Sequence, residues 1–214
     1  MSSSPISPKK PISRPIIMGA VVLLWVCYTA LQTLFVTGNI SELWSAIAGF
    51  APGATGVFVL IAAGFTREQL FLRKTSLSRS GLVILAVIFL LALAVVLPFG
   101  RWQGWNWLAA LVYAPASGIS QELFFRAVLL PAFLMAFKRQ PRLALILHSL
   151  LFGLWHIGPL FLGAPVWAVI AVMVVPFVCG IGWGWQVQRD RTVLWAMLQH
   201  SLIWVVAGQF PMPE

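Results

Sequence analysis

A carboxylate and a guanidinium stand one helical turn apart in an apolar stretch of this chain. They are Glu122 and Arg126, in the run Gln121-Glu-Leu-Phe-Phe-Arg126-Ala-Val-Leu-Leu, in a sequence that holds only five acidic residues among 214. An ionisable side chain at the centre of a bilayer costs about 2.5–3.5 kcal/mol, so such residues usually pair inside the protein and mark working sites. Residues four apart on a helix share one face. The pair is therefore either a buried ion pair that only ties helices together or part of a functional site.

Ser120 precedes this pair, and serine is a preferred N-cap residue. We expect a helix to begin there, with Gln121 and Glu122 in its first turn. The positive end of the helix dipole stabilises an anion at that place. This position would favour the ionised form of Glu122 in spite of its apolar surroundings.

All three histidines lie in apolar runs of the C-terminal half, at His148, His156 and His200. A single histidine on a helix is more often a packing residue, but two imidazoles and a carboxylate in one bundle indicate a site. His148 points about 80° away from His156 on an ideal helix, and we expect it to be structural. The other two and Glu122 allow two chemistries, which the residues leave open: activation of water by a carboxylate and a histidine, or a three-ligand catalytic zinc site.

The elements that position these residues are membrane helices. Hydrophobic residues make up 60% of the chain and charged residues 9%, whereas about a quarter of the residues of a soluble protein are charged. We predict an all-α fold, a polytopic transmembrane bundle of seven to eight helices. The bundle forms a single domain over residues 15–214, after a disordered tail at 1–14. Its apolar runs, each near the length of about 20 residues that spans a bilayer, cover residues 16–36, 43–65, 82–99, 105–137, 142–157, 165–185 and 193–209.

The basic residues predict the orientation of these helices, because cytoplasmic loops are rich in Lys and Arg. With a cytoplasmic N-terminus, seven crossings place twelve basic residues inside and only Arg101 outside, and the C-terminus is external. Residues 105–117 then form a re-entrant or interfacial helix. An alternative with eight crossings breaks the chain at Pro115-Ala-Ser-Gly118 and moves five basic residues outside, so charge favours seven. Topology therefore explains the net charge of +9, and we expect no nucleic-acid partner. We expect an integral protein of a bacterial inner (plasma) membrane, with the lipid bilayer around it.

Three short motifs resemble those of a membrane-protein family, the CAAX protease and bacteriocin-processing proteins, also called CPBP or Abi. The family's Glu-Glu-x-x-x-Arg resembles Gln121 to Arg126, and its Phe-x-x-x-His matches Phe152 and His156. Its His-x-x-x-Asn aligns with the stretch from His200 to Trp204. The resemblance covers about residues 104–208, which would form the core of the domain.

The resemblance implies an intramembrane endopeptidase that hydrolyses a membrane-associated peptide or protein near the membrane surface. Members are commonly classed as metalloproteases, although a metal-free glutamate mechanism is the favoured interpretation. No cofactor is certain; a divalent metal such as zinc would be held by Glu122, His156 and His200. Carried over to this chain, the family's roles give an active site in which Glu122 and His156 activate water, His200 faces the oxyanion, Arg126 positions Glu122, and Gln121 at most orients water.

Two positions depart from the family's motifs. Gln121 stands where the family has the glutamate that acts as base, and a neutral amide cannot accept a proton at working pH. Trp204 replaces the asparagine, which leaves an indole N–H as the donor. Loss of one oxyanion donor costs on the order of 10²–10³ in rate, so Trp204 alone need not abolish activity. Gln121, which replaces the base itself, is the graver departure.

Two functions follow from these motifs. The chain is either an active endopeptidase that uses Glu122 or a catalytically inactive member that binds membrane peptides or regulates a partner protein. A transporter with a proton relay is a third hypothesis, but the ionisable intramembrane groups are confined to one half of the chain rather than repeated in both.

Overall fold

The computed structural model describes residues 12–74, 78–97, 102 and 104–209, and helices without strands form the regular structure of this part. Residues 1–11, which make up most of the expected N-terminal tail, lie outside it. The helices are α1 (Arg14–Val36), α2 (Glu42–Ala48), α3 (Phe50–Ala62), α4 (Arg79–Val96), η1 (Ala109–Tyr113), α5 (Ala114–Phe124), η2 (Phe125–Leu129), α6 (Leu130–Ala136), α7 (Pro141–Leu154), η3 (Gly158–Leu162), α8 (Val166–Asp190) and α9 (Leu194–Gln209).

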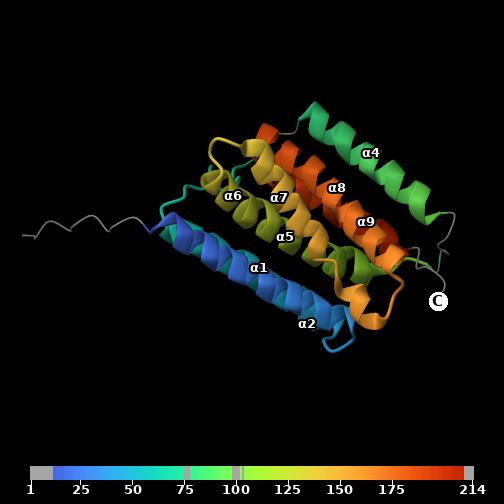
Figure 1. Ribbon diagram of the computed structural model, residues 1–214. Coiled ribbons are helices and arrows are strands. Elements are labelled where there is room, and N and C mark those ends of the chain that lie inside the picture. The colour runs from blue at the N-terminus through green and yellow to red at the C-terminus, as the bar shows by residue number, and fades with distance from the viewer. Residues whose placement is uncertain (1–11, 75–77, 98–101, 103, 210–214) are drawn as a thin grey trace, which may run out of the picture.

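These helices form a membrane bundle, as the sequence predicts. Five segments of the described chain are long and apolar enough to span a bilayer, namely Arg14–Val36, Leu43–Ala62, Ala109–Ala136, Pro141–Leu162 and Val166–Asp190. With α4 and α9, the described residues make seven helical segments. The labelled long helices of Figure 1 run roughly parallel to one another. The all-α prediction is confirmed.

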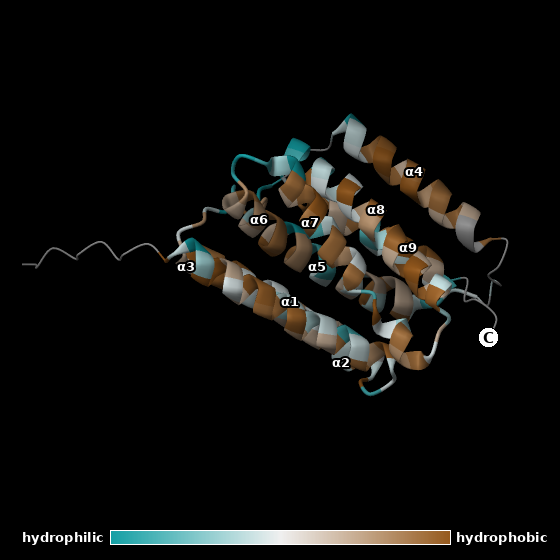
Figure 2. Ribbon diagram, in the orientation of Figure 1, coloured by the Kyte–Doolittle hydropathy of each residue, from teal (hydrophilic) through white to brown (hydrophobic). Residues whose placement is uncertain are grey.

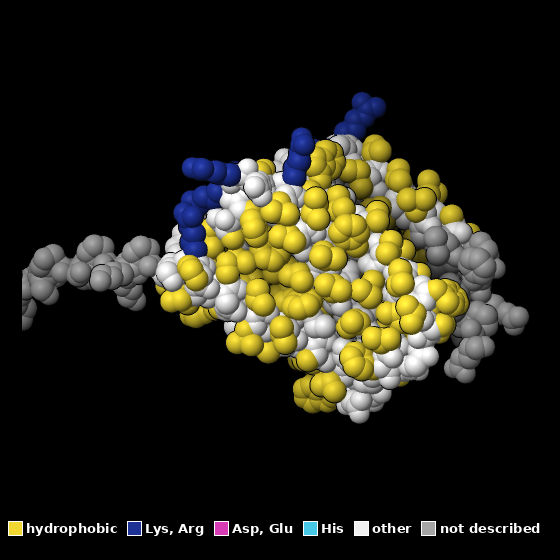
Figure 3. Space-filling model, viewed as in Figure 1, with side chains coloured by type: hydrophobic (Ala, Val, Ile, Leu, Met, Phe, Trp, Pro, Cys, Tyr) yellow, Lys and Arg dark blue, Asp and Glu magenta, His cyan; other side chains and the backbone are white. Residues whose placement is uncertain are grey.

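The helices are coloured mostly as hydrophobic in Figure 2, and apolar side chains cover most of the face of the bundle that Figure 3 shows. Phe58, Leu111 and Trp167 are each more than two-thirds exposed. A water-soluble protein rarely leaves so large an apolar surface uncovered, whereas lipid chains solvate it without cost. The surface therefore faces the bilayer hydrocarbon.

The segment Ala109–Ala136 is the centre of the bundle. It is buried over most of its length, whereas the other four long spans are buried over a third or less. It packs chiefly against α9, α3 and α7. The motif residues Gln121 to Arg126 thus lie on the most enclosed helix of the described chain.

The start of this central helix differs from the prediction in three ways. The helix does not begin at Ser120, so this residue is not an N-cap and Glu122 does not lie in a first turn. No break occurs at residues 115–118, and residues 109–117 are part of the same span rather than a re-entrant helix. A break here would leave backbone N–H and C=O groups without partners in the interior of the bundle.

Two prolines explain how the central helix stays continuous. Pro115 and Pro131 each lack an N–H and clash with the carbonyl four residues earlier. Each follows a π-helical turn, η1 before Pro115 and η2 before Pro131. The wider π turn accommodates the proline, and such turns are frequent at functional sites.

The basic side chains visible in Figure 3 project from one end of the bundle. This end carries the start of α1 and the loops that join α3 to α4, α6 to α7 and α8 to α9, while α9 runs away from it (Figure 1). The order of the seven helical segments along the chain is the one that the seven-crossing prediction gives. Arg101, the single basic residue predicted at the other end, lies outside the described residues.

Candidate functional site

Glu122, Arg126 and His200 meet in the interior of the bundle. Glu122 Oε2 lies 2.9 Å from Arg126 Nε, and Glu122 Oε1 lies 2.8 Å from His200 Nδ1. Glu122 and Arg126 are fully buried, and His200 is 6% exposed. The ion pair predicted from the i, i+4 spacing is confirmed, and each carboxylate oxygen already has a close partner.

Aromatic rings complete the surroundings of Arg126. Its guanidinium carbon lies 4.2 Å from the centre of the Phe152 ring and 5.4 Å from that of Trp183. The faces of aromatic rings attract a cation. The family-like Phe152 thus contacts the arginine of the first motif.

His200 lies between two indole rings. Trp183 stacks on one side, with ring centres 4.8 Å apart, and Trp204 lies 6.5 Å away with its ring at 21°. The Trp183 Nε1–H donates to Gln199 Oε1 at 2.9 Å, which fixes the first ring. Sequence analysis did not single out Trp183, whose role depends on packing between α8 and α9.

Among the described residues, no hydrogen bond or ion pair joins His156 to Glu122, and their predicted action on a water between them stays a prediction. His156 follows the end of α7, and its Nδ1 lies 2.9 Å from the Phe152 carbonyl oxygen. The imidazole that contacts Glu122 is His200. His148, which we expect to be structural, is fully buried in α7.

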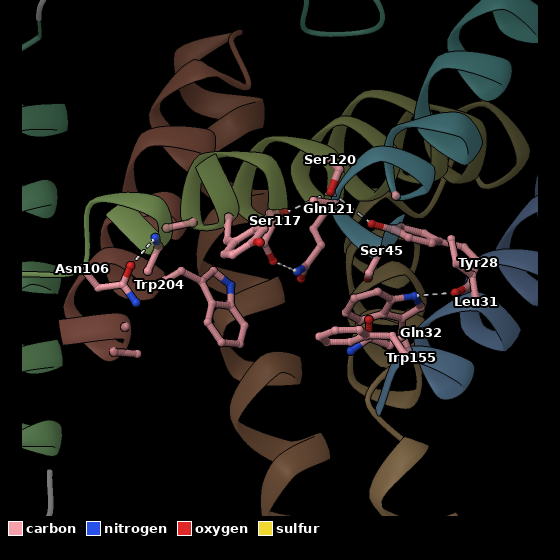
Figure 4. A pocket seen from close by; sticks show the side chains of 18 residues that line it. Tyr28, Leu31, Gln32, Ser45, Asn106, Ser117, Ser120, Gln121, Trp155 and Trp204 are labelled. Atoms are coloured by element: carbon pink, nitrogen blue, oxygen red, sulfur yellow. Dashed lines mark hydrogen bonds between the residues drawn. The ribbon is translucent and has the colours of Figure 1, made fainter. Parts of the chain in front are cut away.

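A cavity of about 420 Å³ lies beside this cluster (Figure 4). Gln121 and Trp204, the two positions that depart from the family's motifs, both line it. Glu122, His156 and His200 do not. The remaining lining residues are Tyr28, Leu31, Gln32, Phe35, Ser45, Ala46, Gly49, Asn106, Ala109, Tyr113, Ala114, Ser117, Ser120, Trp155, Ala207 and Gly208.

Neighbouring residues of the central helix therefore face different places. Successive side chains on an α-helix differ by about 100° in direction. Gln121 faces the cavity and donates from Nε2 to Ser117 Oγ at 2.7 Å, while Glu122 faces the interior. The Gln121 Oε1 atom is buried without a hydrogen-bond partner among the described residues.

The first helix supplies cavity residues that sequence analysis missed. Tyr28 and Gln32 line the cavity, and the Tyr28 hydroxyl lies 3.4 Å from Ser120 Oγ. The Trp155 Nε1–H donates to the Tyr28 carbonyl at 3.2 Å, which holds α1 against the C-terminal half. One signal was present in the sequence: the chain has only two tyrosines, and Tyr28 and Tyr113 both line the cavity.

The predicted metal ligands Glu122, His156 and His200 do not form a metal site. Among the described residues, no three His, Cys, Asp or Glu side chains gather where they could hold an ion. The oxygens of Glu122 face Arg126 and His200, and His156 lies against the Phe152 carbonyl. This donor set does not fit a zinc ion, which takes three protein ligands and an open position in catalytic sites.

Comparison with known proteins shows one family match for this chain. Residues 102–206 match the family described as type II CAAX prenyl endopeptidase Rce1-like. This half of the chain belongs to the Rce1-like family. No curated protein and no solved structure matches the chain. The match to the Rce1-like family contains all three motifs, whereas Tyr28, Gln32 and Ser45 of the cavity wall lie outside it.

Proposed function

We propose that this protein is a peptide-binding member of the Rce1-like family that holds a membrane-associated peptide in the cavity without hydrolysing it efficiently. The observation that carries the proposal is the direction of residues 121 and 122. An amide, Gln121, lines the cavity, and the carboxylate of Glu122 is sealed behind it against Arg126 and His200.

The chemistry of a general base supports peptide binding without efficient hydrolysis. General base catalysis requires a proton acceptor within hydrogen-bond reach of the attacking water. Gln121 can hydrogen-bond a water but cannot accept a proton. A cavity that keeps its hydrogen-bonding groups and lacks a facing carboxylate binds a peptide and cleaves it poorly.

The test compares wild type, Gln121→Glu and Gln121→Ala as purified proteins. Each is given a pool of membrane peptides, and both binding and cleavage are measured. We expect wild type to bind the peptides without cleaving them and Gln121→Glu to cleave them. Gln121→Ala should bind no more tightly than wild type and should not cleave. Efficient cleavage by wild type would overturn the proposal.

A second candidate is an active endopeptidase in which Glu122 is the base. The contact between Glu122 Oε1 and His200 Nδ1 favours it, because His200 lies next to the cavity residue Trp204. In that case wild type cleaves, and Glu122→Gln and His200→Gln both abolish cleavage while peptide binding persists.

A further inference from the structure

The cavity lies in one half of the bundle along the helix axes. The positions of its lining residues on three helices show this, beginning with α1 and α9. On α1 its residues begin at Tyr28, in the second half of a helix that starts at Arg14. On α9 they are Trp204, Ala207 and Gly208, in the last turns of a helix that ends at Gln209.

The central helix agrees with this placement. Its cavity residues run from Ala109 to Gln121, at the end far from Lys138 and Arg139. The cavity therefore occupies the half away from the basic loops. Since basic loops remain in the cytoplasm, this half is the non-cytoplasmic one.

The chemistry of the lining restricts what the cavity binds. Its polar groups are amides and hydroxyls, such as Gln32, Ser45, Asn106 and Ser117, and no described lining residue carries a charge. A phosphate or a free carboxylate is normally recognised by Arg, by Lys or by clustered backbone N–H groups. Neutral amides and hydroxyls instead pair the N–H and C=O groups of a polypeptide backbone, which need partners at membrane depth.

Aromatic rings supply the apolar part of the lining. Tyr28, Tyr113, Trp155 and Trp204 face the cavity, and ring surfaces accept apolar side chains. Sites of this kind, apolar with a few placed polar groups and several hundred Å³ in volume, are typical of specific binding.

From these observations we infer that the cavity receives an uncharged internal segment of a polypeptide from the non-cytoplasmic side of the membrane, and does not read a free C-terminal carboxylate. The inference rests on the proposed peptide binding and adds its side of access and the chemistry of its occupant. The peptides that the cavity binds are therefore segments of exported proteins or external segments of membrane proteins.

Access is tested with single-cysteine variants in a background that carries Cys27→Ala and Cys179→Ala. Ser45→Cys puts a thiol in the cavity wall, and Ser80→Cys puts one at the basic end, as a matched Ser-to-Cys control. Intact cells are treated with a membrane-impermeant maleimide. We expect labelling of Ser45→Cys in intact cells and of Ser80→Cys only after lysis. The reverse pattern, or no labelling of Ser45→Cys in either condition, would overturn the inference.

The occupant is tested by protection of Ser45→Cys from the same reagent. The probe is a capped octapeptide of alanine, leucine and glutamine, compared with versions that carry a free C-terminal carboxylate, a central aspartate or a central lysine. We expect the capped peptide to slow labelling at least tenfold relative to the charged versions. Stronger protection by the carboxylate version would contradict the chemistry that we infer.

Photocrosslinking of the capped peptide to detergent-solubilised wild type separates the two proposals. In detergent both ends of the bundle are accessible. Crosslinking there together with labelling only from the cytoplasmic side leaves peptide binding in place and rejects the inferred side of access. Absence of crosslinking rejects peptide binding itself.

Discussion

At the scale of residues, the sealed pair of Glu122 and Arg126 is first a structural element. Breaking a buried ion pair by removing one charge costs about 3–5 kcal/mol, because the other charge is left unpaired. We expect Glu122→Gln to lower thermal stability in detergent strongly. Arg126→Met in the same chain restores part of the loss, because no unpaired charge remains.

Gln121→Ala is the control for this change, since it removes a neutral neighbour from the same helix. Its unfolding temperature should stay close to that of wild type. Equal stability of Glu122→Gln and wild type would show that the pair does not hold the bundle together.

Trp204 permits a second prediction. The indole lies against His200 and lines the cavity, at the position where the family has asparagine. Combined with Gln121→Glu, Trp204→Asn restores a side-chain amide donor and removes a large ring. Because one oxyanion donor contributes on the order of 10²–10³ in rate, we expect the double variant to cleave faster than Gln121→Glu by about 10². Cleavage by Trp204→Asn alone would contradict the role of Gln121 as the limiting residue.

The sequence predicted the pairing of Glu122 with Arg126 because helical spacing alone brings them together. It did not predict that His200, and not His156, contacts Glu122, since this depends on how α9 packs against α5. Nor did spacing reveal which of Gln121 and Glu122 faces the cavity. The direction of a side chain relative to other helices is set by packing, which a single sequence does not display.

At the scale of elements, the contact between α5 and α9 brings the first and third motifs together. Gly118 lies at this crossing, and a Cβ atom added there would come within 2.5 Å of the Ser201 backbone nitrogen. We expect Gly118→Ala to push the helices apart and to cost about 1–3 kcal/mol, as overpacked cores do. The unfolding temperature and peptide binding should both fall.

Gly182→Ala is the matched control, because a Cβ atom at Gly182 meets nothing within 4 Å. Its stability should equal or slightly exceed that of wild type, since alanine is the better helix former. Equal effects of the two substitutions would show that the close approach at Gly118 is not required.

The same glycine shows why the element boundaries were predicted less well than the elements. Pro115 and Gly118 are turn signals in soluble proteins, and they suggested a break in the chain. In the interior of the bundle, backbone groups freed by a break would lack hydrogen-bond partners, so the helix continues and the π turns accommodate the prolines. The apolar runs predicted where the spans lie. The need to pair buried backbone groups explains why this span continues without a break.

At the scale of the whole molecule, the basic loops at one end predict the placement of both termini. Seven crossings would place residues 12 and 209 on opposite sides of the membrane. Alkaline phosphatase, which is active only outside the cytoplasm, is fused after residue 209 or after residue 191. We expect activity from the first fusion and none from the second, which ends in the basic loop that follows α8.

Activity from the fusion at residue 191 would place the basic loops outside. If the chain crosses the membrane an even number of times and its N-terminus is cytoplasmic, the fusion after residue 209 shows no alkaline phosphatase activity. The helix order and the charge asymmetry could both be predicted from the sequence, because hydropathy and loop charge are local properties.

The opposite directions of Gln121 and Glu122 also have a genetic consequence. The codons for glutamine and glutamate differ only at their first base. Gln121 is not a partner in the ion pair of Glu122 with Arg126, so a glutamate at this position leaves both members of that pair in place. A growing population therefore continually produces cells whose cavity carries a carboxylate. A growth competition between the two alleles would measure what cleavage costs the cell.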